Sequence, residues 1–191
     1  GYSDVTVIHN HIHNLGIETL HATMPLDVFK NTNLALKKLK ETIFGKAISY
    51  EISSSKENKI GYAEGELVGG NLSILYSLLG SASSINTNGK ILFIEDLDEY
   101  LYHIDRILQN LKRNGYFNNL KGLIVGGMTK MHDNNISFGK TSKEIILDAV
   151  LPFNFPVVFD FPAGHIEDNR ALILGRKIKL KVEKEKTALS F

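Results

Sequence analysis

Short apolar runs and stretches of helical periodicity alternate along most of the chain. Continuous apolar runs at residues 91–94 and 123–125 are typical of buried strands. Other apolar or alternating segments predict strands at residues 48–52, 60–68, 157–159, 172–174 and 178–182. Helical spacing predicts helices over residues 4–14, 34–43, 72–79, 101–111 and 141–150, the last capped by Thr141 or Ser142. Strands that alternate with helices indicate the α/β fold class.

The most linker-like stretch is Ser-Ser-Ser-Lys-Glu-Asn at residues 53–58. We place a domain boundary close to it. The expected organisation is a first segment at residues 1–45, a linker at 46–59 and a second domain at 60–191.

Composition excludes several classes of function. The 191 residues are 43% apolar and 23% charged, as in ordinary globular proteins, and the net charge is +1. This balance gives no electrostatic reason to expect binding to nucleic acid or to an anionic membrane. The chain has no cysteine, which excludes disulfides, thiolate metal sites and a cysteine nucleophile. No apolar run approaches the roughly 20 residues needed to span a bilayer.

Ser3 is a candidate nucleophile. Gly1-Tyr2-Ser3-Asp4 predicts a sharp turn that presents the serine hydroxyl at the start of a helix. The match to the G-x-S-x-G elbow is partial because Val5 occupies its last position. The alternative is a serine that only caps the helix, which is common. The strand that should precede an elbow is missing, so we expect the chain to be the C-terminal part of a longer protein.

An acid and a histidine follow predicted strands further along. Glu95 and Asp96 come directly after the buried run 91–94, where acids reach the crevice in which α/β proteins bind ligands. His165 follows a tight Pro-Ala-Gly turn. The alternatives are solvated acids that open a loop and an ordinary loop histidine. Together with Ser3 they supply the residue types of a catalytic triad, which is recognised by geometry rather than by order.

Two other features have both a functional and a structural interpretation. His9, His11 and His13 suggest a metal cluster, but without an H-E-x-x-H pattern we favour a polar helix face and expect no metal. Gly70, which follows another glycine, allows a ligand to approach the backbone, and Asn71 offers a donor and an acceptor beside it.

The ordered set of motifs resembles the LD-carboxypeptidase family, which comprises muramoyl-tetrapeptide carboxypeptidases and their microcin-immunity relatives. The segments that carry the resemblance span nearly the whole chain: Gly-Tyr-Ser-Asp-Val-Thr at 1–6, His21 with Met24-Pro25, Gly-Glu-Leu-Val-Gly-Gly-Asn-Leu-Ser at 65–73, Leu-Phe-Ile-Glu-Asp at 92–96, Ile-Asp-Arg at 104–106 and Phe-Pro-Ala-Gly-His at 161–165.

The resemblance implies a serine peptidase with a triad of Ser3, Glu95 and His165. Glu95 fits the family motif better than Glu99, although spacing alone leaves both open. It also implies two domains: the tail of an N-terminal α/β domain, which carries the elbow, and a smaller C-terminal domain with a barrel-like sheet and flanking helices. The Asp4 N–H would supply one oxyanion donor.

The implied activity is removal of a terminal D-alanine from cell-wall tetrapeptides, with Gly70 and Asn71 as candidates for holding the peptide. No cofactor is expected, a homodimer is a family expectation, and we expect a cytoplasmic protein. The alternatives are cleavage of a peptide–nucleotide antibiotic and non-catalytic binding of muropeptides. The family's glycine-rich segment upstream of the elbow is absent, so we expect the 191-residue chain alone to be a poor enzyme.

Overall fold

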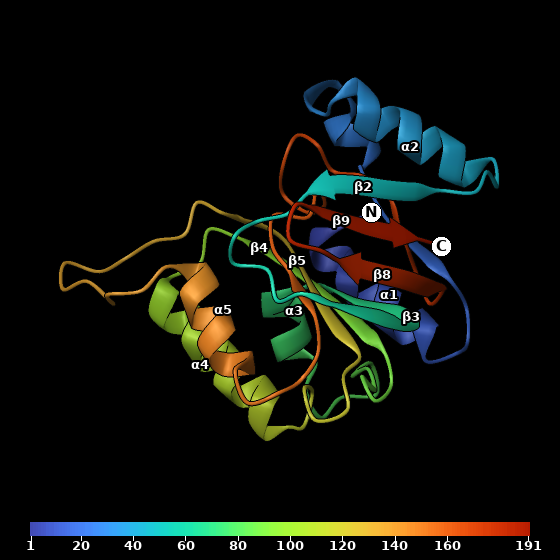
Figure 1. Ribbon diagram of the computed structural model, residues 1–191. Helices are drawn as coiled ribbons and strands as arrows, with labels where there is room; N and C mark the ends of the chain where they lie inside the picture. Colours follow the sequence, from blue (N-terminus) through green and yellow to red (C-terminus); the bar gives the residue numbers. More distant parts are fainter.

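The fold is described by a computed structural model that covers residues 1–191 (Figure 1). Its main sheet has seven strands in the order β2-β9-β8-β3-β4-β5-β6. In chain order these strands are β2 (Ser49–Ser53), β3 (Gly61–Asn71), β4 (Ile91–Leu97), β5 (Gly122–Thr129), β6 (Val157–Val158), β8 (Lys177–Val182) and β9 (Lys186–Ser190). The α/β class predicted from the sequence is therefore confirmed.

The long strand β3 joins two halves of this sheet. Residues 61–66 pair antiparallel with β8, and residues 67–71 pair parallel with β4. The strands β3, β4, β5 and β6 form the parallel half, whereas β2, β9 and β8 pair antiparallel. A single antiparallel bridge between Lys59 and Val157 connects the β6 edge back to the start of β3.

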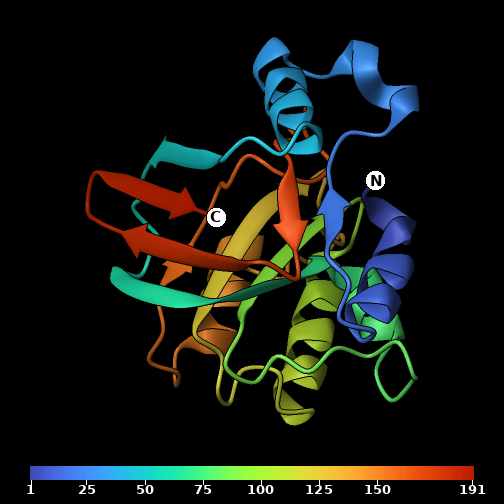
Figure 2. The same cartoon turned by 90° about the vertical axis from the view of Figure 1, so that its right-hand side faces the viewer.

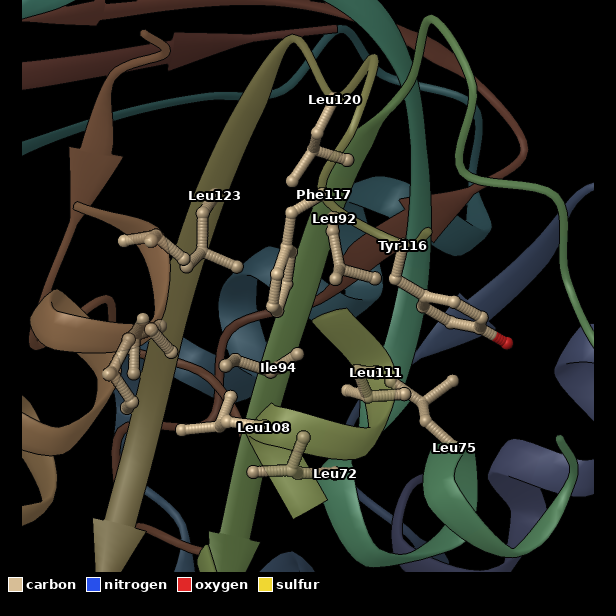
Figure 3. Close-up of a cluster of buried hydrophobic side chains, with 14 of the residues drawn as sticks. Leu72, Leu75, Leu92, Ile94, Leu108, Leu111, Tyr116, Phe117, Leu120 and Leu123 are labelled. Atoms are coloured by element: carbon tan, nitrogen blue, oxygen red, sulfur yellow. The ribbon is translucent and has the colours of Figure 1, made fainter. Parts of the chain in front are cut away.

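Three helices cover one face of the parallel strands: α3 (Leu72–Ser77), α4 (Leu101–Arg113) and α5 (Ser142–Val150) (Figure 1). A cluster of 22 buried residues fills the space between helices and sheet. Figure 3 shows Leu108 and Leu111 of α4 pointing toward Leu92 and Ile94 of β4. Burial of this apolar stripe is the main stabilising term for α4, as its helical periodicity predicted.

A second cluster of 17 buried residues lies on the other side of the strands and includes Phe93 and Phe161. It is covered by a two-stranded antiparallel sheet of β1 (Thr19–His21) and β7 (Leu172–Leu174), visible side by side in Figure 2. Phe93 on β4 belongs to this cluster while Leu92 and Ile94 belong to the other, because successive strand residues face opposite sides. The run 91–94 is apolar throughout for this reason.

The N-terminal part of the chain contains the 3-10 helix η1 (Ser3–Val5), α1 (Thr6–His13), the 3-10 helix η2 (Pro25–Lys30) and α2 (Asn33–Ile43). The Gly1 amine donates to the Leu20 carbonyl at 3.2 Å, and the Ala22 N–H donates to the Gly1 carbonyl at 3.2 Å. These two bonds have the pattern of a parallel ladder in which Gly1 lies opposite His21. The backbone that leads into Ser3 is therefore held at the edge of the β1–β7 sheet.

The sequence predicted most elements but missed β1, η2 and β9. The expected strand at 60–68 extends to Asn71, and the expected helix at 4–14 is split between η1 and α1. Part of the expected linker at 46–59 is the strand β2, which pairs with β9 along residues 186–190. The assignment of residues 1–45 and 60–191 to separate domains stays a prediction. No helix is both long enough and apolar enough to cross a membrane.

Candidate active site

The site is built around a hydrogen bond between His165 and Glu95. The imidazole Nδ1 of His165 lies 2.7 Å from Glu95 Oε2, and the His165 backbone N–H donates to the same oxygen at 3.2 Å. Glu95 lies near the carboxyl end of β4 and is completely buried, whereas the His165 side chain is 15% exposed. One ring nitrogen is thus fixed by a buried carboxylate, and Nε2 has no partner within the chain.

A glycine allows this contact. Gly164 has φ +102°, and a Cβ at this position would lie 2.6 Å from Glu95 Oε2 and 2.7 Å from Glu95 Cβ. Its N–H donates to Asn169 Oδ1 at 2.9 Å, and Thr129 Oγ1 donates to the His165 carbonyl at 3.2 Å. The turn is therefore fixed on both sides of the histidine, and only glycine lets the backbone approach the carboxylate so closely.

Ser3 has the backbone conformation of a nucleophile elbow. Its φ is +63°, which is uncommon for a residue with a side chain and is typical of strained functional positions. The first hydrogen bond of the turn joins Val5 N–H to the Tyr2 carbonyl at 3.3 Å, so the Asp4 N–H has no acceptor within the chain. An oxyanion site requires such a free donor, and the assignment of Asp4 to this role stays a prediction.

The structure places Tyr2, the residue directly before Ser3, against the histidine, and shows no hydrogen bond between Ser3 and His165. The Tyr2 ring packs edge-on against the His165 ring, with their centroids 4.8 Å apart. The Ser3 hydroxyl makes no hydrogen bond to any residue, including His165. Catalytic hydrogen bonds are often long in the absence of substrate, so this arrangement is compatible with a nucleophile–base pair.

The surroundings of His165 set its protonation. Burial lowers the pKa of His165, but the hydrogen bond and negative charge of Glu95, with smaller contributions from Asp96 and Asp27, outweigh it and raise this pKa above the usual 6.5. His21, which is fully buried on β1, has a pKa well below 6.5 because of burial first and then nearby positive charge. His21 is therefore neutral and adds no charge to the site.

An open cleft of about 790 Å³ lies over the His165 ring. It is lined by Tyr2, Asp27, Phe29, Lys30, Asn31, Leu97, Thr129, Lys130, His165, Ile166 and Glu167. Both charged and apolar groups line it, and Phe29 on η2 is 99% exposed at its rim. The cleft has the size of a small-ligand site and gives a polar ligand access to the histidine.

Three of the four acids that follow the apolar run of β4 are candidates for the histidine's partner, and they have different contacts. Glu95 binds His165, whereas Glu99 binds His103 Nδ1 at 2.6 Å and accepts a hydrogen bond from Ser73 at 3.0 Å. Asp96 accepts hydrogen bonds from Asn71, Ser73 and the Leu97 backbone, and burial raises its pKa. The geometry therefore fits Glu95, rather than Glu99, as the acid that orients the histidine.

Gly70 and Asn71 have structural contacts. A Cβ on Gly70 would lie 2.5 Å from Thr6 Oγ1, so this glycine allows β3 to pack against α1. Asn71 is 6% exposed; its Oδ1 caps α3 by accepting from Ile74 N–H at 3.1 Å, and its Nδ2 donates to Asp96 at 2.9 Å. The expectation that these two residues hold substrate stays a prediction.

The histidines of α1 have separate partners. His9 binds Thr19 and the Gly1 carbonyl, at 2.8 and 2.9 Å, and so supports the elbow. His11 Nδ1 lies 3.0 Å from Ser83 Oγ, and His13 Nε2 lies 2.7 Å from Lys90 Nζ. We interpreted these histidines as an exposed polar face of the helix. Only His11 agrees with this interpretation, because His9 and His13 are buried.

Sequence reasoning missed Tyr2 and Asp27 as members of the site. Tyr2 belongs to the elbow motif, so its position beside Ser3 was a usable signal. Asp27 lies on η2, which the sequence did not predict, and its contact with Tyr2 connects residues 25 positions apart. No local pattern identifies such a pair.

The fold and the site define an α/β protein with a histidine–carboxylate pair at the carboxyl ends of its parallel strands. Comparison with known families assigns it further: the model of the LD-carboxypeptidase C-terminal domain matches residues 64–180. The chain therefore belongs to the LD-carboxypeptidase family. The matched residues lie inside the segment 60–191 that we expected to form the C-terminal domain.

Individual relatives agree with this assignment. The chain is 37% identical, over 99% of its length, to a probable murein peptide carboxypeptidase of Bacillus subtilis, of which it covers 61%. It is 26% identical to the crystal structure of muramoyltetrapeptide carboxypeptidase from Oxalobacter formigenes, with a TM-score of 0.91, and covers 66% of that chain. It also shares the fold of the microcin C7 self-immunity protein MccF, with a TM-score of 0.85 at 21% identity over 66% of that chain. The chain thus spans about 60% of the length of the curated relatives it matches.

Proposed function

We propose that the complete protein containing this chain is a serine-type LD-carboxypeptidase that removes the terminal D-alanine from muropeptide tetrapeptides. The observation that carries the proposal is the 2.7 Å contact between the His165 ring and the buried Glu95 carboxylate, beside the ring of Tyr2, the residue that precedes a serine with a φ of +63°. The names of the relatives, murein peptide and muramoyltetrapeptide carboxypeptidases, support the substrate class.

In this mechanism Ser3 attacks the carbonyl carbon of the amide bond before the terminal D-alanine. His165 Nε2 takes the proton from Ser3 Oγ, while Glu95 holds the ring by Nδ1 and stabilises the imidazolium that forms. The Asp4 N–H donates to the oxyanion of the tetrahedral intermediate. His165 then gives its proton to the leaving amine, D-alanine departs, and water hydrolyses the acyl-enzyme by the reverse sequence of proton transfers. None of these steps requires a metal or an organic cofactor.

The test is release of D-alanine, measured by chromatography, from a muropeptide tetrapeptide. We expect release by the complete protein with and without a chelator, and none by Ser3→Ala. Ser81→Ala is the matched control, because Ser81 is exposed and donates only to the Leu78 carbonyl of its own turn. A tetrapeptide ending in L-alanine should remain intact.

The other outcomes identify the alternatives. Cleavage of a peptide–nucleotide conjugate in place of the tetrapeptide would assign an immunity-type peptidase. Binding of the tetrapeptide without any turnover by the complete protein would assign a muropeptide-binding protein. Loss of D-alanine release on addition of a chelator would contradict the metal-free mechanism and indicate a metal-dependent one.

We further propose that the protein acts in the cytoplasm on peptides recycled from peptidoglycan, and that it is a homodimer. The family assignment supports both. Analytical ultracentrifugation of the complete protein tests the dimer, and fractionation of the producing cells tests the location.

A further inference from the structure

Tyr2 and Asp27 form a second set of contacts around His165. The Tyr2 ring meets the His165 ring edge-on, at an interplanar angle of 77°. The Tyr2 hydroxyl donates to Asp27 Oδ2 at 3.1 Å. All three side chains line the same cleft. The residue directly before the candidate nucleophile thus connects the histidine with η2.

Asp27 is itself fixed. Its Oδ1 accepts from Lys30 Nζ at 3.2 Å, and its backbone carbonyl accepts from Asn31 Nδ2 at 2.9 Å. The Asp27 side chain is 14% exposed although η2 lies at the surface. A continuous series of contacts therefore runs from η2 through Asp27 and the Tyr2 phenol to the His165 ring.

The hydrogen bond to Glu95 does not fix the whole imidazole. It fixes Nδ1, but the ring can still tilt about this contact, which moves Nε2 relative to Ser3. An aromatic edge against the ring restricts that tilt, and aromatic side chains are rigid because they have few rotatable bonds. A phenol held by a carboxylate cannot turn away from the ring without breaking its hydrogen bond.

The titratable groups around His165 come from several elements. Glu95 and Asp96 face it from β4, and Asp27 faces it from η2. His21 on β1 is neutral, and the Tyr2 hydroxyl, whose pKa is raised to about 12 by burial and by its bond to Asp27, stays protonated. Lys30 on η2, Lys130 after β5 and Glu167 after His165 also line the cleft. Among the acids that raise the pKa of His165, Asp27 is the one that β4 does not supply.

We propose that Tyr2 and Asp27 are positioning residues that hold the His165 ring so that its Nε2 is directed toward Ser3. Tyr2 acts through its ring, and Asp27 acts by holding the phenol and by its charge. The inference rests on the proposed function for its effect on turnover, but the arrangement of the rings is testable without it.

The first experiment measures kcat and KM for D-alanine release by the complete protein. Tyr2→Leu removes the ring, and we expect kcat to fall about 10- to 100-fold with little change in KM, since small misplacements of a catalytic group are costly. Tyr2→Phe keeps the ring and should lose only a few-fold. Tyr62→Leu is the matched control: Tyr62 donates to Glu64 at 3.1 Å in an equivalent phenol–carboxylate pair on the exposed surface of β3. It should retain full turnover.

The second experiment titrates the His165 ring by NMR and uses the pH profile of kcat/KM. Asp27→Asn keeps an oxygen that can accept from Tyr2 but removes the charge, so the His165 pKa and the acid limb of the profile should both move to lower pH. Tyr2→Phe should retain the nuclear Overhauser contacts between the two rings, and Tyr2→Leu should broaden the His165 ring signals. A merely structural role for Asp27 would leave the titration midpoint unchanged.

Every outcome bears on the inference. Normal kcat in Tyr2→Leu, or an unchanged His165 midpoint in Asp27→Asn, overturns it. If Tyr2→Leu fails to fold, the ring contacts in Tyr2→Phe and the His165 midpoint in Asp27→Asn decide whether the two residues position His165. If the wild-type protein releases no D-alanine, the proposed function fails, and the NMR titration still decides whether Tyr2 and Asp27 hold the ring.

Discussion

Glu95 Oε2 and His165 Nδ1 lie 2.7 Å apart although 70 positions separate the two residues in the chain. The parallel strand β4 carries the acid, and the turn that follows β6 carries the histidine. Glu95 is fully buried and has one oxygen, Oε1, without a hydrogen-bond partner. A buried carboxylate of this kind depends strongly on the histidine for stabilisation.

The contact predicts that substitution of Glu95 abolishes most of the activity. Glu95→Gln keeps the shape of the side chain but removes the charge that stabilises the imidazolium and selects its tautomer. We expect kcat for D-alanine release to fall on the order of 10³- to 10⁴-fold, as in other triads that lose their acid. Glu99→Gln is the matched control, because Glu99 binds His103 and Ser73 instead of His165. Near-normal turnover by Glu95→Gln together with an inactive Glu99→Gln would reverse the assignment.

The raised pKa of His165 predicts a pH dependence. The general base must be neutral, so kcat/KM should rise with pH through a midpoint above 6.5. Stability should respond in the opposite sense. The folded-state pKa lies above the unfolded value, so the stabilisation from the His165–Glu95 pair is complete below about pH 6.5 and is lost as pH rises through the folded pKa.

Both effects are measurable in the same protein. The pH profile of kcat/KM reports the His165 midpoint, and Glu95→Gln should move this midpoint down. Urea titrations of the wild type and of Glu95→Gln isolate the His165–Glu95 contribution, because the lowered pKa values of His9, His13 and His21 affect both proteins alike. The difference in unfolding free energy between the two proteins should shrink as pH rises above 6.5. A midpoint below 6.5 in the wild-type protein would contradict the prediction.

Gly164→Ala should lower both stability and kcat. Its cost in stability should exceed the strain of a positive φ alone. The added Cβ would lie 2.6 Å from Glu95 Oε2, so the turn must move away from the carboxylate. Gly139→Ala is the matched control, because Gly139 has φ +80° and no atom within 4 Å of its Cβ position. We expect the control to cost about 1–2 kcal/mol of unfolding free energy. Gly164→Ala should cost more and also reduce kcat; equal losses in the two variants would mean that the close approach is unimportant.

Asn71→Ala should destabilise the fold because it removes two interactions. The variant loses the cap of α3 and leaves the buried Asp96 without the amide donor at 2.9 Å. Loss of a cap typically costs about 1 kcal/mol, and loss of a bond to a buried charge about 1.5–3 kcal/mol more. Thr32→Ala isolates the cap, since Thr32 accepts from Ala35 N–H at 3.1 Å in the same way. Denaturant unfolding of both variants compares them, and equal losses would show that the bond to Asp96 adds nothing.

The sequence by itself determined the α/β class and the positions of the main helices. The apolar stripe of α4 is visible in the spacing of Ile104, Leu108 and Leu111, because helix periodicity is a local property. The capping box of α5 is likewise encoded by Thr141 and Glu144, three positions apart. The acid at the end of β4 and the glycine before His165 were also identifiable from their neighbours.

Only the tertiary structure decided which groups meet. Glu95 and Glu99 both follow the same apolar run, and their partners depend on how β4 and α4 are placed against the rest of the fold. The short strands β1 and β9 carry weak local signals and exist because β7, β2 and β8 supply their hydrogen bonds. The Tyr2–Asp27 pair likewise arises from the packing of the elbow against η2. Contacts between distant segments are set by sheet register and loop closure, which no short sequence pattern encodes.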